Sequence, residues 1–235
     1  MTTFVLVHGA WHGGWCYDRV ARLLRGKGHD VYTPTLTGLG ERSHLIDRSV
    51  NLSTHIDDVA GVLAFEDLSD VVLCGHSYGG MVISGVAEKA EKRIRSLVFL
   101  DAFVPESGKS LFDYVPSEAA GSMRADAAQN GEGHKVAPRA AEHFNVNAAD
   151  RAWVDAMCVK HPIATFEEGV PLTGARERVA KRTFIQAKGY GRSPFGQFAE
   201  KLGGDPAWRV LAVPCGHDVM VDMPQELADL LIAAA

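Results

Sequence analysis

The chain has 235 residues, of which 46% are hydrophobic and 23% charged, and its formal net charge is -5. This composition is typical of an ordinary globular protein, and the length predicts one large α/β domain with an insertion. Lysine and arginine are scattered along a mildly acidic chain. Because binding to a phosphate backbone needs clustered positive charge, nucleic acid is excluded as an expected partner.

The amino terminus carries no pattern typical of export or membrane insertion. Met1, Thr2 and Thr3 lead directly into a short apolar run, and no apolar run in the chain approaches membrane-spanning length. We therefore expect a cytoplasmic protein without membrane contact. The cysteines are far apart and form no CxxC pair, so we expect them to be reduced.

Strands and helices alternate along most of the chain. Buried-type apolar runs predict strands at 4–7, 31–32, 70–74, 96–100, 182–186 and 209–213. Apolar residues at helical spacing predict helices at 17–24, 56–65, 81–90, 195–202 and 225–232. Because parallel strands need crossover connections, this order predicts a mostly parallel, doubly wound sheet of about six strands with helices on both faces.

The alternation stops between Val104 and Lys181, over a stretch far longer than an ordinary loop. We predict that residues 1–104 and 182–235 form the core. Residues 105–181 are predicted to form an inserted helical cap, called the cap segment below.

One motif indicates covalent chemistry. Gly75-His76-Ser77-Tyr78-Gly79 matches G-x-S-x-G, and it lies between a predicted buried strand and a predicted helix, where a sharp turn exposes the serine. The alternative is a serine that only caps the helix between packing glycines. We favour Ser77 as a nucleophile.

A serine hydroxyl needs a base, and His217 is the histidine that directly follows the last predicted strand. Ligands of such sheets bind beyond the carboxyl ends of the strands, so His217 is expected to face Ser77. His134, His143 and His161 lie in the cap segment, where packing is the favoured interpretation and substrate contact the alternative.

The third residue of a triad is a carboxylate that orients the base. Its usual place, after the strand that precedes the base, contains no Asp or Glu between residues 187 and 194. Asp101 ends an earlier apolar strand at the same expected edge as Ser77, whereas Asp205 precedes a strand and falls at the opposite edge. We predict Asp101 as the acid, with a turn residue as its alternative role and Asp205 as its rival.

The loop after the first strand, His8-Gly9-Ala10-Trp11, indicates which backbone amides bind an oxyanion. In such a sheet this loop and the residue after the nucleophile donate amides to an oxyanion, which predicts Ala10 and Tyr78. The loop does not match G-x-G-x-x-G, and the chain has no HExxH or cysteine cluster, so we expect neither a nucleotide cofactor nor a metal.

With these motifs, the chain resembles the α/β-hydrolase superfamily over essentially its whole length. Residues 6–15 and 34–42 look like the branch that holds plant methyl esterases, hydroxynitrile lyases and bacterial esterases of the pyrethroid-hydrolase kind. Two features depart from that pattern. The usual acid is missing, and Asp218 follows His217 where the plant lyases have a lysine.

The resemblance implies a serine carboxylesterase that acts through an acyl-enzyme. An apolar cap favours small to medium hydrophobic esters, and Trp11, Trp153 and Met157 are our candidates for substrate binding. Two alternatives remain. The first is a hydroxynitrile-lyase-like or other cofactor-free reaction of the same Ser-His pair, and the second is a non-catalytic ligand receptor.

Overall fold

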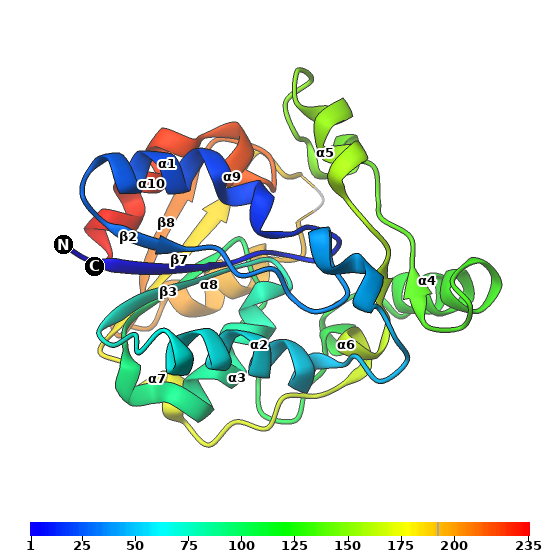
Figure 1. Ribbon diagram of the computed structural model, residues 1–235, viewed down its shortest axis with the longest axis horizontal. Coiled ribbons are helices and arrows are strands. Elements are labelled where there is room, and N and C mark those ends of the chain that lie inside the picture. The colour runs from blue at the N-terminus through cyan, green and yellow to red at the C-terminus, as the bar shows by residue number, and fades with distance from the viewer. Residues whose placement is uncertain (192) are drawn as a thin grey trace.

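The computed structural model describes residues 1–191 and 193–235. Arg192, part of the stretch that lacks an acid after the penultimate strand, lies outside the described residues. The predicted fold class is confirmed, because a parallel sheet flanked by helices forms the centre of the molecule (Figure 1).

Six strands form the central sheet in the order β2-β1-β3-β4-β7-β8, and every neighbouring pair is parallel. Their bounds are β1 Thr3–Val7, β2 Asp30–Tyr32, β3 Val71–His76, β4 Ile94–Leu100, β7 Lys181–Ala187 and β8 Arg209–Val213. Every residue of β3 is buried, as expected of a central strand covered on both faces.

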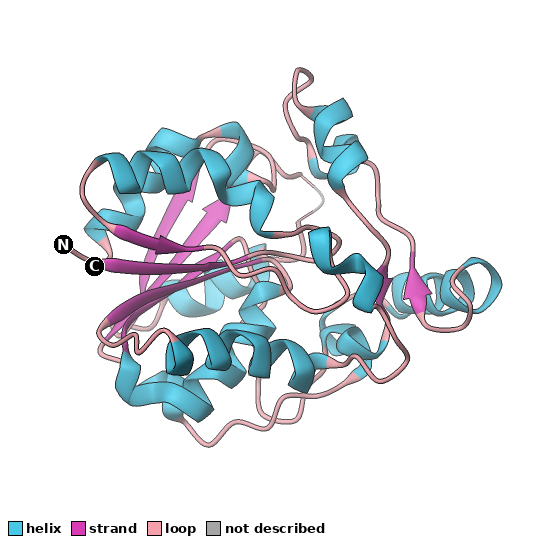
Figure 2. Ribbon diagram, viewed as in Figure 1, coloured by secondary structure: helices cyan, strands magenta, loops and turns pink. Residues whose placement is uncertain are grey.

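Helices cover both faces of the sheet, which Figure 2 shows as a magenta layer between cyan layers. On one face lie α1 (Asp18–Gly26), α9 (Val219–Asp222) and α10 (Pro224–Ala233), and on the other lie α2 (Leu52–Phe65) and α3 (Gly79–Ala90). Helix α8 (Gly196–Gly203) packs against β7 and β8. Short 3-10 turns occur at Gly14–Tyr17, Gly40–Leu45 and Glu91–Arg93.

Helix α2 begins four residues before the predicted start, and its capping explains the difference. The Asn51 side chain accepts a hydrogen bond of 3.0 Å from the Thr54 amide, and the Thr54 hydroxyl accepts one from the Asn51 amide. This capping box satisfies amides of the first turn, so the helix starts before its apolar stripe does.

Most of the cap segment lies beyond the carboxyl ends of the strands, where Figure 1 draws it mainly in green. The cap segment contains α4 (Ser117–Asn130), α5 (Arg151–Met157), α6 (Ala164–Glu167) and α7 (Ala175–Arg178), the 3-10 turns Leu111–Tyr114 and Ala141–Phe144, and an antiparallel pair, β5 (Lys135–Val136) and β6 (His161–Pro162). Its last helix, α7, instead lies beside α3, towards the amino ends of the strands. The division of the chain into a core and an inserted cap stays a prediction.

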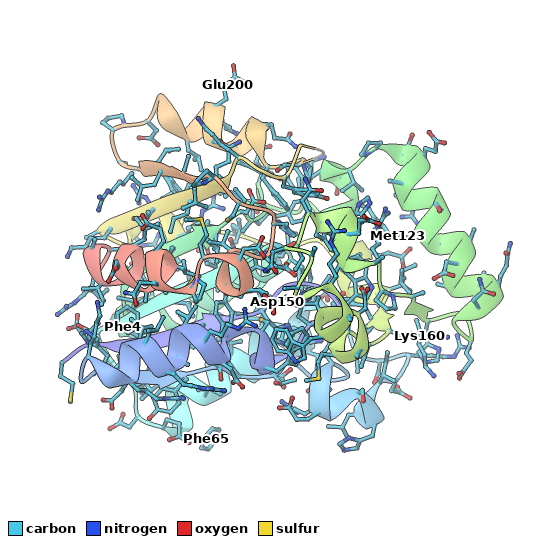
Figure 3. All side chains as sticks on the ribbon, turned by 90° about the horizontal axis from the view of Figure 1, so that it is seen from above. Phe4, Phe65, Met123, Asp150, Lys160 and Glu200 are labelled. Atoms are coloured by element: carbon cyan, nitrogen blue, oxygen red, sulfur yellow. The ribbon has the colours of Figure 1, made fainter. Side chains whose placement is uncertain are left out.

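The hydrophobic core fills the space on both sides of the sheet. Phe4 of β1 is fully buried, whereas Phe65 at the end of α2 is 93% exposed and projects from the surface (Figure 3). Among the described residues, no helix has the length and apolarity needed to cross a bilayer.

Candidate active site

Four loops meet at the carboxyl edge of the sheet, and each one follows a different strand. Ser77 follows β3, Asp101 follows β4, His217 lies beyond β8, and Ala10 lies beyond β1. The parallel register brings the strand ends into line, with His76 paired to Leu100. Residues far apart in the sequence therefore share one edge.

Ser77 lies in a sharp turn with a left-handed backbone, φ +53°. Such a conformation is strained for a residue with a side chain, and it needs close backbone approach around it. A Cβ on Gly75 would lie 2.5 Å from the Gly79 carbonyl oxygen, and one on Gly79 would lie 2.8 Å from that of Val7. The flanking glycines are therefore required for the turn itself.

His217 and Asp101 contact each other directly. Asp101 Oδ2 accepts a hydrogen bond of 2.7 Å from His217 Nδ1, and Asp101 Oδ1 accepts one of 3.1 Å from the Ala187 amide. Both side chains are buried. Because Nδ1 donates its proton to the carboxylate, the other ring nitrogen of His217, Nε2, is left as an acceptor.

The His217 ring lies among aromatic rings that the sequence motifs did not indicate. Phe195 stacks on it with ring centroids 5.1 Å apart and an interplanar angle of 8°, and Phe144 and Tyr190 lie 5.4 and 5.0 Å away. The Phe144 carbonyl also accepts the backbone N–H of His217 at 2.9 Å. These contacts fix the orientation of the imidazole.

Two backbone amides stand beside Ser77 with no acceptor. Among the described residues, neither the Ala10 amide nor the Tyr78 amide donates a hydrogen bond, although both residues are buried. Buried amides are normally paired, so two free amides next to the Ser77 hydroxyl in the pocket are suited to bind an oxygen that becomes negatively charged.

The neighbouring amide of Trp11 is occupied by the cap segment. His161 Nδ1 accepts a hydrogen bond of 3.1 Å from the Trp11 amide, while His161 Nε2 and the Thr165 hydroxyl are 2.7 Å apart. Burial keeps the pKa of His161 well below its usual value, so the ring is neutral and can accept at Nδ1. Trp11 itself has φ +65°.

Tyr78 is anchored through its side chain. Its hydroxyl is 2.8 Å from His55 Nδ1, and His55 Nε2 is 2.8 Å from the Thr37 carbonyl oxygen. Since a carbonyl only accepts, His55 carries its proton on Nε2 and accepts from the Tyr78 hydroxyl. Burial lowers the pKa of His55 to about 4, which agrees with a neutral ring.

A buried ion pair lies behind the loop that holds Ala10. His12 Nε2 is 3.1 Å from Asp218 Oδ2, and His12 Nδ1 is 2.7 Å from the Ala10 carbonyl oxygen. Both partners of the ring are acceptors, so His12 must carry both protons. Burial opposes this charge, but Asp218 outweighs it and raises the pKa of His12 above its usual value.

Asp218 is charged for the same reason. Burial favours its neutral form, yet His12 outweighs burial and holds the pKa of Asp218 below its usual range. His76, His217 and Asp218 offer ligand atoms that lie within 4.8 Å of one another. Asp218 is already paired with His12, and His76 Nε2 donates to the His217 carbonyl at 3.0 Å, so this group serves packing within the chain.

A pocket of about 180 Å³ opens above Ser77. His217, Ala10 and Tyr78 line it together with Ser77, and the cap segment contributes mainly apolar side chains, among them Leu111, Val115, Met123, Phe144 and Phe166. Figure 3 labels Met123 on α4.

The residues predicted to bind substrate lie in different places. Trp11 lines the pocket. Within the described part of the chain, Trp153 and Met157 are not among the lining residues. Trp153 instead packs edge-on against Trp15, with centroids 5.0 Å apart, and Met157 is 37% exposed.

The rival acid lies away from this pocket. Asp205 is exposed, precedes β8, and accepts a hydrogen bond of 2.9 Å from the Ala207 amide. It serves a turn at the amino edge of the sheet.

Comparison with known proteins agrees with this architecture. A family model described as "Alpha/beta hydrolase family" matches residues 4–230. The chain is 50% identical to a carbendazim hydrolyzing esterase of Nocardioides sp. (strain SG-4G) over 99% of both chains. It is also 36% identical to a pyrethroid hydrolase of Sphingobium wenxiniae, over 46% of this chain and 38% of that one.

A solved structure of similar shape extends the comparison to three dimensions. An extracellular alpha/beta-hydrolase from a Paenibacillus species superposes with a TM-score of 0.87 at 25% identity, covering 100% of this chain and 99% of that chain.

Proposed function

The chain belongs to the alpha/beta hydrolase family, and from that premise we propose that it is a serine carboxylesterase with Ser77, His217 and Asp101 as its triad. The prediction that it is an enzyme, a carboxylic ester hydrolase, is confirmed by its relationship to known esterases. The observation that carries the proposed triad is the 2.7 Å contact between His217 Nδ1 and Asp101 Oδ2, on a ring that lines the same pocket as Ser77.

In the proposed acylation step, the Ser77 hydroxyl oxygen attacks the ester carbonyl carbon while His217 Nε2 takes the hydroxyl proton. Asp101 remains ionised and stabilises the imidazolium that forms. The tetrahedral intermediate then collapses, the bond to the alcohol breaks, and His217 returns the proton to the leaving alcohol. The products of this step are the free alcohol and an acyl-Ser77 ester.

The amides of Ala10 and Tyr78 are proposed to bind the negatively charged oxygen of each tetrahedral intermediate. Neither amide has another acceptor in the described part of the chain, which supports this role, because a preorganised donor needs no rearrangement during the reaction. In deacylation, a water molecule gives its proton to His217 and attacks the acyl carbon. Ser77 leaves as the alkoxide, takes the proton back, and the carboxylic acid is released.

The lyase alternative receives no support from the residue after His217. Asp218 is fully buried, is paired with His12 and does not line the pocket, so it offers no positive charge to a leaving anion. The proposed substrates are small to medium esters that fit an apolar pocket of about 180 Å³.

The experiment is hydrolysis of p-nitrophenyl esters of increasing acyl length by the wild-type protein and by Ser77→Ala. We expect turnover with an optimum at short to medium acyl chains, and a loss of several orders of magnitude in Ser77→Ala. A serine-directed phosphonate should label the wild-type protein stoichiometrically and leave Ser77→Ala unlabelled. Turnover that survives in Ser77→Ala, or its absence in the wild type, contradicts the proposal.

A further inference from the structure

One side chain of the pocket carries a charge, whereas the side chains around it are mainly apolar. Arg139 lines the pocket together with Ser77 and His217, and it is the one residue with a permanent charge among the described lining residues. The side chains around it are mainly apolar, so its charge is not explained by the hydrophobic ester proposed above.

Arg139 also differs from the other arginines of the molecule. Every other arginine in the described part of the chain makes a hydrogen bond or an ion pair, and Arg139 makes neither. Its side chain is half-buried. A guanidinium has five donors and is always charged, so a half-buried one without an acceptor is a feature to be explained.

The backbone around Arg139 is held in place at both ends. The Ala137 amide donates to the Asp126 carboxylate of α4 at 2.8 Å, and the Ala141 amide donates to the Asp155 carboxylate of α5 at 2.7 Å. Each of these acids accepts a backbone N–H, and neither forms an ion pair with Arg139 within the part of the chain that the structure describes. The nearby Glu142 is likewise paired, with Arg151 at 2.7 Å. Arg139 therefore lies at the pocket, and its charge has no counterion among the residues that the structure describes.

We propose that Arg139 is a specificity-determining residue that binds a carboxylate on the substrate, so that the pocket takes esters carrying a second, free carboxyl group away from the scissile bond. This inference rests on the proposed esterase function and narrows its substrate class.

Geometry favours a carboxylate for this role. The planar guanidinium can donate two parallel hydrogen bonds to the two oxygens of a carboxylate, which gives orientation as well as attraction. In a pocket whose other walls are apolar, that attraction is screened less than on an open surface. The rest of such a substrate would contact the apolar side chains, with its ester carbonyl at Ser77.

The test compares matched ester pairs. On the acyl side, p-nitrophenyl monoesters of adipic and suberic acid are compared with p-nitrophenyl esters of uncharged acyl chains of equal length. On the alcohol side, 4-carboxyphenyl acetate is compared with phenyl acetate, followed by acid release at constant pH. The readout is the charge preference, defined as kcat/KM for the charged ester divided by kcat/KM for its uncharged partner.

We expect Arg139→Gln to lower the charge preference about 10- to 100-fold in the acyl-side comparison, the alcohol-side comparison or both. This is the effect of losing a hydrogen-bonded pair of opposite charges. Arg139→Glu should lower it further, and Arg139→Lys should restore part of it, because lysine keeps the charge but loses the paired geometry. The comparison in which the charge preference falls identifies the side of the ester that carries the carboxylate.

Lys160→Gln is the matched control. Lys160 is exposed in the cap segment, does not line the pocket, and its loss changes the net charge by the same amount (Figure 3). We expect it to keep the wild-type charge preference.

The outcomes separate this inference from the proposed function. Suppose that the wild type hydrolyses both esters of each pair, and that Arg139→Gln and Arg139→Glu keep the wild-type charge preference. The role proposed for Arg139 is then wrong, and the proposed esterase function is unaffected. If the wild type hydrolyses none of the esters, or Ser77→Ala hydrolyses them as fast, the proposed function fails and this inference fails with it.

Discussion

His12 and Asp218 are 206 residues apart in the chain, yet His12 Nε2 lies 3.1 Å from Asp218 Oδ2 in the interior of the molecule. This ion pair connects the loop after β1, which holds the proposed oxyanion donor Ala10, with the residue that follows the proposed base His217. The two loops are therefore joined by charge as well as by packing.

Asp218→Asn should destabilise the protein strongly. It leaves the His12 cation buried without a counterion, which typically costs about 3–5 kcal/mol of the free energy of unfolding. Urea unfolding near neutral pH measures the change. The control is Asp229→Asn, since Asp229 pairs with Lys27 at 2.6 Å on the surface and its loss should cost less than about 1 kcal/mol. Equal losses in the two variants would contradict a charged His12.

Asp101→Asn should reduce kcat by about three to four orders of magnitude, because an amide no longer stabilises the imidazolium of His217. The expected loss of kcat is that known for an Asp-to-Asn substitution of the triad acid in a serine protease. Asp205→Asn, on the exposed turn before β8, should keep near-wild-type kcat. Kinetics with a p-nitrophenyl ester decides between the two acids, and the reverse result would assign the acid to Asp205.

Gly80→Ala should destabilise the turn that carries Ser77. An added Cβ would lie 2.1 Å from the Phe103 carbonyl oxygen, and the strain of such overpacking is about 1–3 kcal/mol or more. We expect a lower midpoint of thermal unfolding together with lower kcat.

Gly61→Ala is the matched control for that prediction. Gly61 is inside α2, and nothing lies within 4 Å of an added Cβ there. Alanine should stabilise the helix by about 0.5–1 kcal/mol. A Gly80→Ala variant as stable as Gly61→Ala would show that the turn is not closely packed against the Phe103 backbone.

Stability should fall as the pH drops below about 6.5, because several buried histidines are neutral in the folded chain. Burial lowers the pKa of His8 to about 3 and that of His55 to about 4, and it holds those of His76 and His161 well below the usual value. Below pH 6.5 the unfolded chain therefore binds protons that the folded chain does not, so acid favours unfolding. His8 and His55 each contribute about 2 kcal/mol of loss between pH 7.5 and 5.

Urea unfolding at pH 7.5 and pH 5 measures this dependence. His55→Gln should reduce the slope of unfolding free energy against pH. His12 acts with the opposite sign, since its raised pKa adds stability below pH 6.5 that is lost as the pH rises through that higher value. A protein equally stable at pH 7.5 and pH 5 would contradict neutral buried histidines.

The sequence by itself determined the fold class and the positions of the chemistry-bearing loops. Apolar runs of strand length alternated with helical spacing, and a parallel sheet then requires residues after its strands to meet at one edge. That reasoning led from the missing acid after β7 to Asp101, whose carboxylate lies 2.7 Å from His217. Local pattern and topology were sufficient to predict where these loops lie, because each loop directly follows a strand that the sequence itself indicates.

Only the tertiary structure decided what each buried polar group is paired with. His12 is a cation because Asp218 faces it, whereas His161 is neutral because burial lowers its pKa, and its Nδ1 accepts from the Trp11 amide. Nothing in the sequence around either histidine distinguishes them. Among the described residues Arg139 has no hydrogen-bond partner, while the acids on α4 and α5 bind the backbone amides on either side of it. Protonation states and unpaired charges depend on partners that folding brings together from distant segments, so no local pattern encodes them.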